Sequence, residues 1–234
     1  MRTLLQRTII DKEPNLCPIW LMRQAGRYMP EYMAVKKASK GFLDMALDPV
    51  KASDITMQPI KAFDMDAAII FSDILIIPYA LGQGLDYVPA PKLDPFDPKI
   101  FDTDFKTFFE KCEPVYEAIR KTRQQLDPSK SLIGFVGAPW TLYRYMTGNK
   151  DVSSMDPFTS RDHIQSLARF CIEHLSKQIE AGCDCVQVFD SWAGDLGEDF
   201  IIDYCFEPTS QIVSEIKTRY PDVGIIAPNI IDEN

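Results

Sequence analysis

Short apolar runs alternate with longer amphipathic stretches along this chain. The apolar runs are bounded by turn residues and carry the continuous apolar character of strands that are covered on both faces. The expected strands are Pro18–Met22, Ala67–Phe71, Leu132–Val136, Cys185–Phe189 and Gly224–Ala227. Because helical patterns lie between them, the sequence predicts βα units around a parallel sheet.

The helical patterns have recognisable ends. Asp48 can cap a helix whose first residue, Pro49, tolerates that position well. Apolar residues repeat with the 3.6-residue period between a cap at Ser160 and a helix-ending glycine at Gly182. The expected helices span residues 49–63, 105–119, 160–182 and 207–219.

The stretch from Pro78 to Pro98 contains five prolines and two glycines, which is too broken a pattern for a helix. Long connections of this kind often carry function in compact domains. We therefore expect a loop near the mouth of a site, with a surface hairpin as the alternative.

The length of 234 residues suits one sizeable domain and is slightly short of the ~250 residues of a typical α/β barrel. There is no internal repeat and no low-complexity tract, so no domain boundary is expected. No apolar run is long enough for a signal peptide or for a membrane helix of ~18 residues. A soluble cytoplasmic protein with no membrane association is expected.

The net charge of −9 argues against nucleic acid as a partner, because nucleic acids are bound by basic faces. The charge is uneven, since residues 1–40 carry a balance of +5 and the remainder a balance of −14. A basic segment on an acidic body fits an anionic small molecule. A solvated charge asymmetry without a ligand fits equally well.

Metal-binding patterns are missing from the sequence. The six cysteines are scattered, and Cys183 and Cys185 have no Cys or His at ligand spacing. His163 and His174 lie on one expected helix, ~16 Å apart along its axis, so they cannot share a metal. We expect buried thiols, histidines that pack on the surface or flank, no metal and no catalytic histidine.

Polar residues follow the expected strands, where the active site of an α/β barrel is built. Arg23 and Arg27 flank Gly26 after the first strand and can direct two planar forks at carboxylates or phosphates. Asp73 follows the next strand. It is either a carboxylate of the site or an ion-pair partner of those arginines, and the residues alone leave both open.

Four motifs resemble one known family in type and order. Residues 18–31 (PIWLMRQAGRYMPE) and 134–142 (GFVGAPWTL) are similar to the two signatures of uroporphyrinogen decarboxylases. Residues 71–75 (FSDIL) and 187–194 (QVFDSWAG) resemble two further segments of that family. The resemblance thus extends from residue 18 to residue 194.

The resemblance implies an α/β fold of the (β/α)8 TIM-barrel type, in a single domain over residues 1–234. The family pattern continues past Asn234 with further strands, helices and a site histidine, so an incomplete barrel is expected. The implied activity is that of a lyase in porphyrin and haem biosynthesis. It removes the four acetate carboxyls of uroporphyrinogen III to give coproporphyrinogen III. No cofactor is implied, because a protonated pyrrole can accept the electrons released as carbon dioxide leaves.

The resemblance also implies roles for individual residues. Arg23, Arg27 and Asp73 are the expected catalytic residues: the arginines bind and polarise carboxylates, and Asp73 holds the pyrrole nitrogens. An acceptor carboxylate suits four converging pyrrole N–H donors, and arginine forks suit the carboxylates on the rim of the substrate. The expected substrate-binding residues are Arg23, Gln24, Ala25, Gly26, Arg27, Asp73, Tyr145 and Ser191.

Two other interpretations remain. One is a related barrel methyltransferase, whose relatives carry zinc ligands late in the barrel, beyond the residues present here. The other is a non-catalytic chain that binds a tetrapyrrole or a partner. The arginines at positions 23 and 27 favour the decarboxylase.

We expect the purified 234-residue chain to self-associate, as a homodimer or larger, and to show no measurable decarboxylation alone. The reason is that an unclosed parallel sheet presents unpaired backbone groups along the Gly224–Ala227 edge. Sedimentation at several protein concentrations checks the self-association, and a product assay checks the absence of decarboxylation. A monomer that forms coproporphyrinogen contradicts them.

Overall fold

The computed structural model describes residues 1–22, 24–87, 90–148 and 154–228. Its centre is a parallel sheet with the strand order β1-β4-β5-β6, which follows the order of the chain. The strands are β1 (Ala67–Ile69), β4 (Ser131–Gly137), β5 (Cys185–Phe189) and β6 (Gly224–Ile226). The predicted parallel sheet is confirmed, with four of the five expected strands in place.

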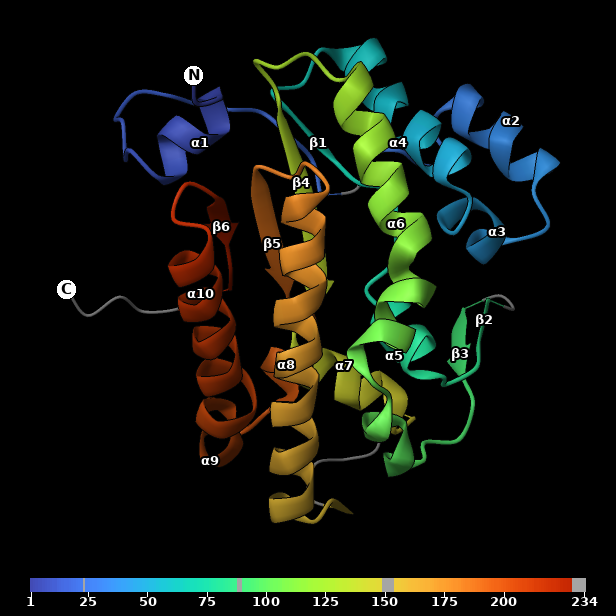
Figure 1. The fold of residues 1–234 in the computed structure, drawn as a ribbon, viewed down its shortest axis with the longest axis vertical. Coiled ribbons are helices and arrows are strands. Elements are labelled where there is room, and N and C mark those ends of the chain that lie inside the picture. Colours follow the sequence, from blue (N-terminus) through green and yellow to red (C-terminus); the bar gives the residue numbers. More distant parts are fainter. Residues whose placement is uncertain (23, 88–89, 149–153, 229–234) are drawn as a thin grey trace.

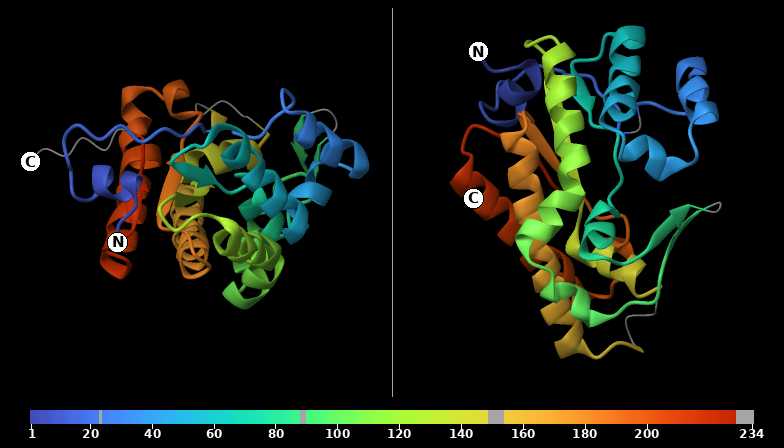
Figure 2. Two further views of the ribbon diagram at one scale, coloured as in Figure 1. Left: turned by 90° about the horizontal axis from the view of Figure 1, so that it is seen from above. Right: turned by 45° about the vertical axis from the view of Figure 1, so that its right-hand side comes forward.

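Long helices cover one face of this sheet (Figures 1 and 2). They are α4 (Pro49–Phe63), α6 (Phe105–Gln125), α8 (Pro157–Glu180) and α10 (Glu207–Arg219). The remaining helical segments are α1 (Leu4–Ile9), α2 (Pro30–Ala38), α3 (Phe42–Ala46), α5 (Ile76–Leu81), α7 (Pro139–Met146), α9 (Glu198–Ile201), the 3₁₀ turns Pro98–Asp102 and Ala193–Asp195, and a π-helical turn Ile202–Phe206.

The four predicted helices are confirmed, and their caps explain the bounds. Asp48 caps α4 by accepting from the N–H groups of Val50 and Lys51. Helix α8 begins before the predicted cap at Ser160, because the Asp156 side chain accepts from the N–H of Thr159. Among the described residues, every helix is too short or too polar to span a membrane.

Side chains of the strands alternate between two faces of the sheet. One set packs into the large core beneath the helices: Ala68, Ile70, Leu132, Val136, Val186 and Val188. The other set forms a smaller cluster with Leu5 of α1 on the face opposite the long helices: Ala67, Ile69, Ile133 and Cys185. Both faces are therefore apolar, as the continuous apolar runs indicate.

Helix α1 lies at the amino-terminal ends of the strands. Gln6 donates its side-chain amide to the carbonyls of Asp184 and Asp222, at 3.4 and 3.2 Å, and each of these carbonyls lies just before a strand. The Thr3 hydroxyl meets that of Ser131 at the start of β4. The carboxyl ends of the strands are thus left as the open end of the sheet.

The predicted strand Pro18–Met22 is wrong. The segment runs beside β1 but contributes one main-chain bond, from the N–H of Asp66 to the carbonyl of Ile19. The N–H of Ile19 donates instead to the Asp66 carboxylate. A strand requires a ladder of main-chain bonds, and the described residues of this segment form none beyond that pair.

The prediction for Pro78–Pro98 is partly wrong. Pro78 lies inside α5, which tolerates it because a proline in the first helical turn lacks only an N–H that has no partner in the helix. A hairpin follows, formed by β2 (Leu85–Tyr87) and β3 (Pro91–Leu93). The segment forms a hairpin, as in the alternative, and its Tyr87 and Pro91 line the cavity described below, as the expected position near a site implies. The expectation of one domain over residues 1–234 stays a prediction.

One buried histidine of the helical layer is paired with a tyrosine. His174 is buried, contrary to the expected flank position, and the Tyr116 hydroxyl lies 2.8 Å from its Nδ1. Burial lowers the pKa of His174 to about 3, so the ring is neutral and accepts from Tyr116. Five cysteines are buried as expected, whereas Cys17 is exposed.

The burial of His174 predicts a loss of stability in acid. Its folded pKa lies below the unfolded value of about 6.5, so below pH 6.5 the unfolded chain takes up a proton that the folded chain refuses. From pH 7 to pH 5 this residue should lower the free energy of unfolding by ~2 kcal/mol. Urea unfolding of the wild type and of His174→Gln at both pH values measures it; equal losses in the two proteins would contradict the assignment.

Candidate active site

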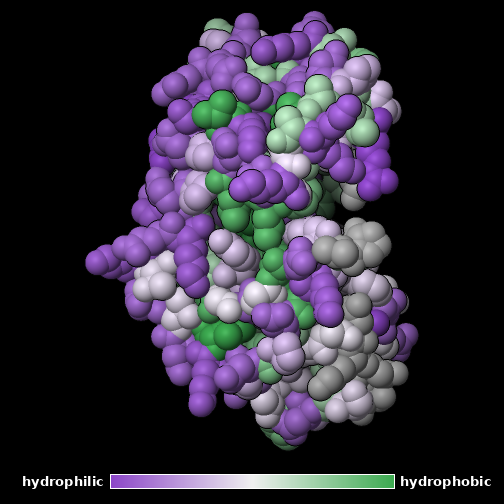
Figure 3. Space-filling view, turned by 90° about the vertical axis from the view of Figure 1, so that its right-hand side faces the viewer, coloured by the Kyte–Doolittle hydropathy of each residue, from purple (hydrophilic) through white to green (hydrophobic). Residues whose placement is uncertain are grey.

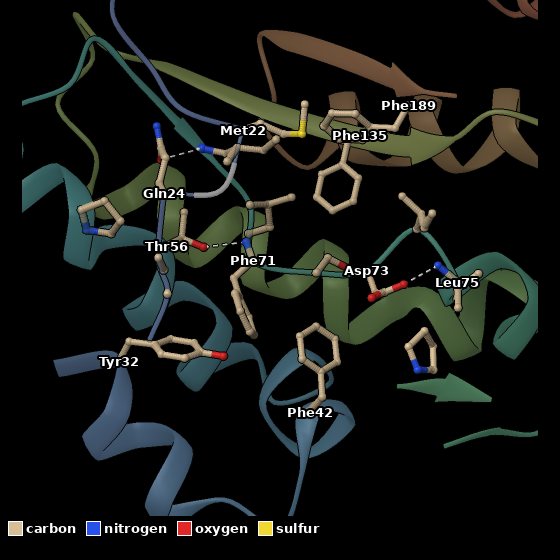
Figure 4. A pocket seen from close by; sticks show the side chains of 18 of the residues that line it. Met22, Gln24, Tyr32, Phe42, Thr56, Phe71, Asp73, Leu75, Phe135 and Phe189 are labelled. Carbon is tan, nitrogen blue, oxygen red and sulfur yellow. Dashed lines mark hydrogen bonds between the residues drawn. The ribbon is translucent and has the colours of Figure 1, made fainter. Parts of the chain in front are cut away.

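A cavity of about 1030 Å³ lies at the carboxyl ends of the strands, over the face of the sheet opposite the long helices. Ile69 of β1 contributes to its apolar wall, together with Phe135 of β4 and Phe189 of β5, which Figure 4 shows. The side of the molecule that carries α2, α3 and the β2–β3 hairpin shows apolar side chains gathered in a hollow between two largely hydrophilic parts (Figure 3). This position is the one where α/β barrels build their sites.

Seven of the eight expected substrate-binding residues line this one cavity. They are Gln24, Ala25, Gly26, Arg27, Asp73, Tyr145 and Ser191. The eighth, Arg23, lies outside the described residues. The predicted clustering holds for all the described candidates, whereas their individual roles stay predictions.

Asp73 is fixed by the backbone around it. Its Oδ1 accepts from the N–H of Leu75 at 2.7 Å, just before α5. Two residues earlier, the N–H of Phe71 donates to the Thr56 hydroxyl of α4 at 2.9 Å (Figure 4). The carboxylate therefore has a defined direction at the end of β1.

The side-chain amide of Gln24 forms hydrogen bonds with the main chain of β1. The amide donates to the carbonyl of Ala67 at 2.7 Å and accepts from the N–H of Ile69 at 3.3 Å. These are the main-chain groups of β1 that a neighbouring strand would bond. Gln24 is 3% exposed, so this amide is committed to β1, and its share of the cavity wall is limited to its remaining atoms.

Arg27 lies in the loop before α2 and is exposed. It makes no ion pair with any described carboxylate, so it is available to a ligand. The neighbouring Tyr28 hydroxyl donates to the carbonyl of Gln24, which stabilises the turn that carries Arg27. Arg27 is therefore not the ion-pair partner that the sequence allowed for Asp73.

Bonds between α7, which follows β4 and carries Tyr145, and the segment after β5, which carries Ser191, position these two residues. The Trp140 indole N–H donates to the carbonyl of Trp192 at 3.0 Å, and the Thr141 hydroxyl donates to Asp190 at 2.6 Å. Burial raises the pKa of Asp190, and the Thr141 bond opposes this rise. The two motifs that contain these residues thus form one unit around Ser191.

Gly137 is required at the junction of β4 and α7. A Cβ there would lie 2.8 Å from Leu142 Cδ2 and 3.1 Å from Ile74 Cβ. Ile74 follows Asp73 directly, so a larger residue would displace the segment that holds the carboxylate. This glycine allows the close approach of two site loops.

Sequence reasoning missed an aromatic wall of the cavity formed by Tyr32, Phe42, Phe71 and Tyr87. Phe42 packs against Phe71 and Tyr87 with ring centroids 5.3 and 4.7 Å apart. These residues come from α2, α3, the end of β1 and the hairpin. The predicted loop near the site mouth was the one available signal, and it did not single out Tyr87.

No group of three or more His, Cys, Asp and Glu side chains in the described ranges could hold a metal ion. The described polar lining consists of carboxylate, guanidinium, hydroxyl and amide groups. Such a set can bind a ligand that carries both carboxylates and N–H donors.

The fold and the cavity define an α/β-barrel protein with a site at the carboxyl ends of its strands. A methyltransferase from Methanosarcina mazei has a similar structure, with a TM-score of 0.71 over 97% of this chain and 69% of that one. At 14% sequence identity, this likeness supports the TIM-barrel type of fold alone.

Sequence comparison assigns the family. The chain matches the uroporphyrinogen decarboxylase (URO-D) family over residues 2–227. It is 45% identical to the uroporphyrinogen decarboxylase of Rickettsia bellii over 232 residues, and 42% identical to that of Brucella anthropi over 221 residues. These matches cover 93% and 89% of this chain, and 67% and 65% of the relatives. The chain belongs to the uroporphyrinogen decarboxylase family and spans about two thirds of the length of these relatives.

The role of Gln24 predicts a stability effect. Gln24→Leu keeps the size of the side chain but leaves the Ala67 carbonyl and the Ile69 N–H without their bonds to Gln24. This change should lower the free energy of unfolding by about 3 kcal/mol. Gln124→Leu, on the exposed side of α6, is the matched control. The free energy of unfolding is measured with urea. Equal free energies for the two variants would show that the Gln24 amide does not stabilise β1.

Proposed function

We propose that the cavity binds uroporphyrinogen III and is the site at which its four acetate carboxyls are removed to give coproporphyrinogen III. The observation that carries this proposal is the presence of Arg27 and Asp73 on one cavity with apolar and aromatic walls. Its volume lies at the upper end of the ~300–1,000 Å³ range of small-molecule sites. Family membership supports the same substrate.

The substrate chemistry fits the groups in the cavity. A porphyrinogen has an apolar macrocycle, pyrrole N–H donors at its centre and carboxylates at its rim. Asp73 accepts from the central N–H groups, and Arg27 binds a rim carboxylate, with Tyr145 and Ser191 as hydroxyl donors to further acid groups. Arg23 has the same proposed role as Arg27, although it lies outside the described residues.

The proposed reaction needs a proton and an electron sink. A proton added to a pyrrole carbon makes the ring cationic, and the bond from the acetate methylene to its carboxylate then breaks. Carbon dioxide leaves, and the electron pair of that bond forms a double bond between the methylene carbon and the ring, which neutralises the ring. The methylene carbon then takes up a proton and the ring carbon loses the proton it had gained, so the arm ends as a methyl group. Asp73 near the nitrogens stabilises the cationic ring, and the apolar walls strengthen this effect by excluding water.

Removal of the Asp73 charge should weaken substrate binding. Asp73→Asn keeps the acceptor for the Leu75 N–H but loses a charge-assisted bond, which corresponds to a 10- to 100-fold rise in Kd for uroporphyrinogen III, or about 1.5–3 kcal/mol. Fluorescence quenching under anaerobic conditions measures Kd. The melting temperature should change by less than about 2 °C.

Asp54→Asn, on the exposed side of α4, is the control and should keep the wild-type Kd. A large loss of melting temperature in Asp73→Asn with unchanged Kd would make Asp73 a structural residue. The absence of any binding by the wild-type chain would refute the proposal. Assay of coproporphyrinogen in the same samples separates a catalytic chain from one that binds the tetrapyrrole without turnover.

A further inference from the structure

Tyr87 presents a hydroxyl to the same cavity from an element that the family motifs do not include. It is the last residue of β2 in the hairpin and lines the cavity together with Asp73 and Tyr145. The hairpin is anchored at its base by Gln83, whose amide donates to the carbonyls of Asp94 and Met146 at 2.7 and 2.9 Å. The position of Tyr87 is therefore tied to α7 as well as to the hairpin.

The Tyr87 ring is held by tilted aromatic contacts. Its centroid lies 4.7 Å from that of Phe42, and Phe42 packs against Phe71 at 5.3 Å. Phe71 lies two residues before Asp73 in the segment that follows β1. The ring is thus held against the segment that carries the carboxylate, with its hydroxyl directed into the interior.

The Tyr87 hydroxyl is buried and lacks a hydrogen-bond partner of good geometry among the described residues. A buried hydroxyl in this state is costly, so it favours any arrangement that supplies an acceptor. Burial raises the pKa of Tyr87, and the negative charge of Asp73 raises it further. Asp73 and Tyr87 line the same cavity, and the Phe42 ring packs against both Tyr87 and Phe71, two residues before Asp73, so this carboxylate is the candidate acceptor.

We propose that the Tyr87 hydroxyl is a positioning group for Asp73, to whose carboxylate it donates a hydrogen bond from the hairpin side of the cavity. Asp73 already accepts from the N–H of Leu75 through Oδ1. An ionised carboxylate has room for several donors, so a bond from Tyr87 adds a second fixed point. Two fixed points define the orientation of the carboxylate, and a donor also favours its ionised form.

Several titratable groups line the cavity around Asp73 and have to be considered with it. Arg27 and Tyr28 come from the loop before α2, Tyr32 from α2 and Tyr145 from α7. Tyr145 also raises the pKa of Tyr87, as a minor cause. A test must therefore remove the Tyr87 hydroxyl alone, which Tyr87→Phe does while the ring contacts with Phe42 remain.

Titration of the Asp73 carboxyl by ¹³C NMR in the ligand-free chain tests the proposal independently of the proposed function. Tyr87→Phe should raise the titration midpoint of the Asp73 carboxyl by about one pH unit, which is a tenfold change in its proton affinity. Tyr79→Phe on α5 removes a tyrosine hydroxyl outside this cavity and should leave the midpoint unchanged. An unchanged midpoint in Tyr87→Phe, with a wild-type melting temperature, overturns the proposal.

A double-mutant cycle on uroporphyrinogen III binding distinguishes action through Asp73 from direct contact with the ligand; this second test rests on the proposed function. Tyr87→Phe should raise Kd several-fold in the wild-type background and have no further effect in Asp73→Asn. Equal losses in both backgrounds would show that Tyr87 contacts the ligand itself and overturn the positioning role. A wild-type chain that binds no ligand would refute the proposed function, and the NMR midpoint would still decide the role of Tyr87.

Discussion

The parallel register of β1, β4 and β5 determines where the candidate groups lie. Ala67 pairs with Ser131 and Ile133 pairs with Cys185, so the strands end at one common edge of the sheet. Asp73, Tyr145 and Ser191 come after three different strands, yet this register brings them to one cavity. The long helices occupy one face, and the carboxyl ends of the strands on the other face form the apolar wall.

The loops at that edge depend on one another through buried polar bonds. The segment after β4 bonds the segment after β5, through Thr141 and Asp190, and the Asp73 segment approaches Gly137 closely. The motif residues therefore contact one another in the folded protein, in addition to supplying the candidate ligand-binding groups. Gln24 is the clearest case, because its amide completes the bonding of β1 while Arg27, three residues later, faces solvent.

The sequence predicted the sheet and the long helices well because these depend on local signals: apolar runs, the 3.6-residue period and caps such as Asp48. Strand ends and family motifs also predicted that the described candidate residues lie on one cavity, whereas their roles stay predictions. The sequence prediction failed at Pro18–Met22, where main-chain pairing with a neighbour decides the structure. It missed Tyr87, because a hairpin places that ring by packing against Phe42, a contact between residues 45 positions apart. Such long-range contacts have no local pattern.

The bonds of α1 have a consequence for the order in which the chain folds. Gln6 is joined to the carbonyls of Asp184 and Asp222, across 178 and 216 positions of sequence. Contacts that close such long loops carry a large entropic cost and form only after the intervening elements are ordered. During synthesis α1 precedes β5 and β6, so its apolar side has no site to occupy until those strands have been made. A nascent chain of this protein therefore carries α1 unsatisfied over that interval, when it is a segment that chaperones can bind.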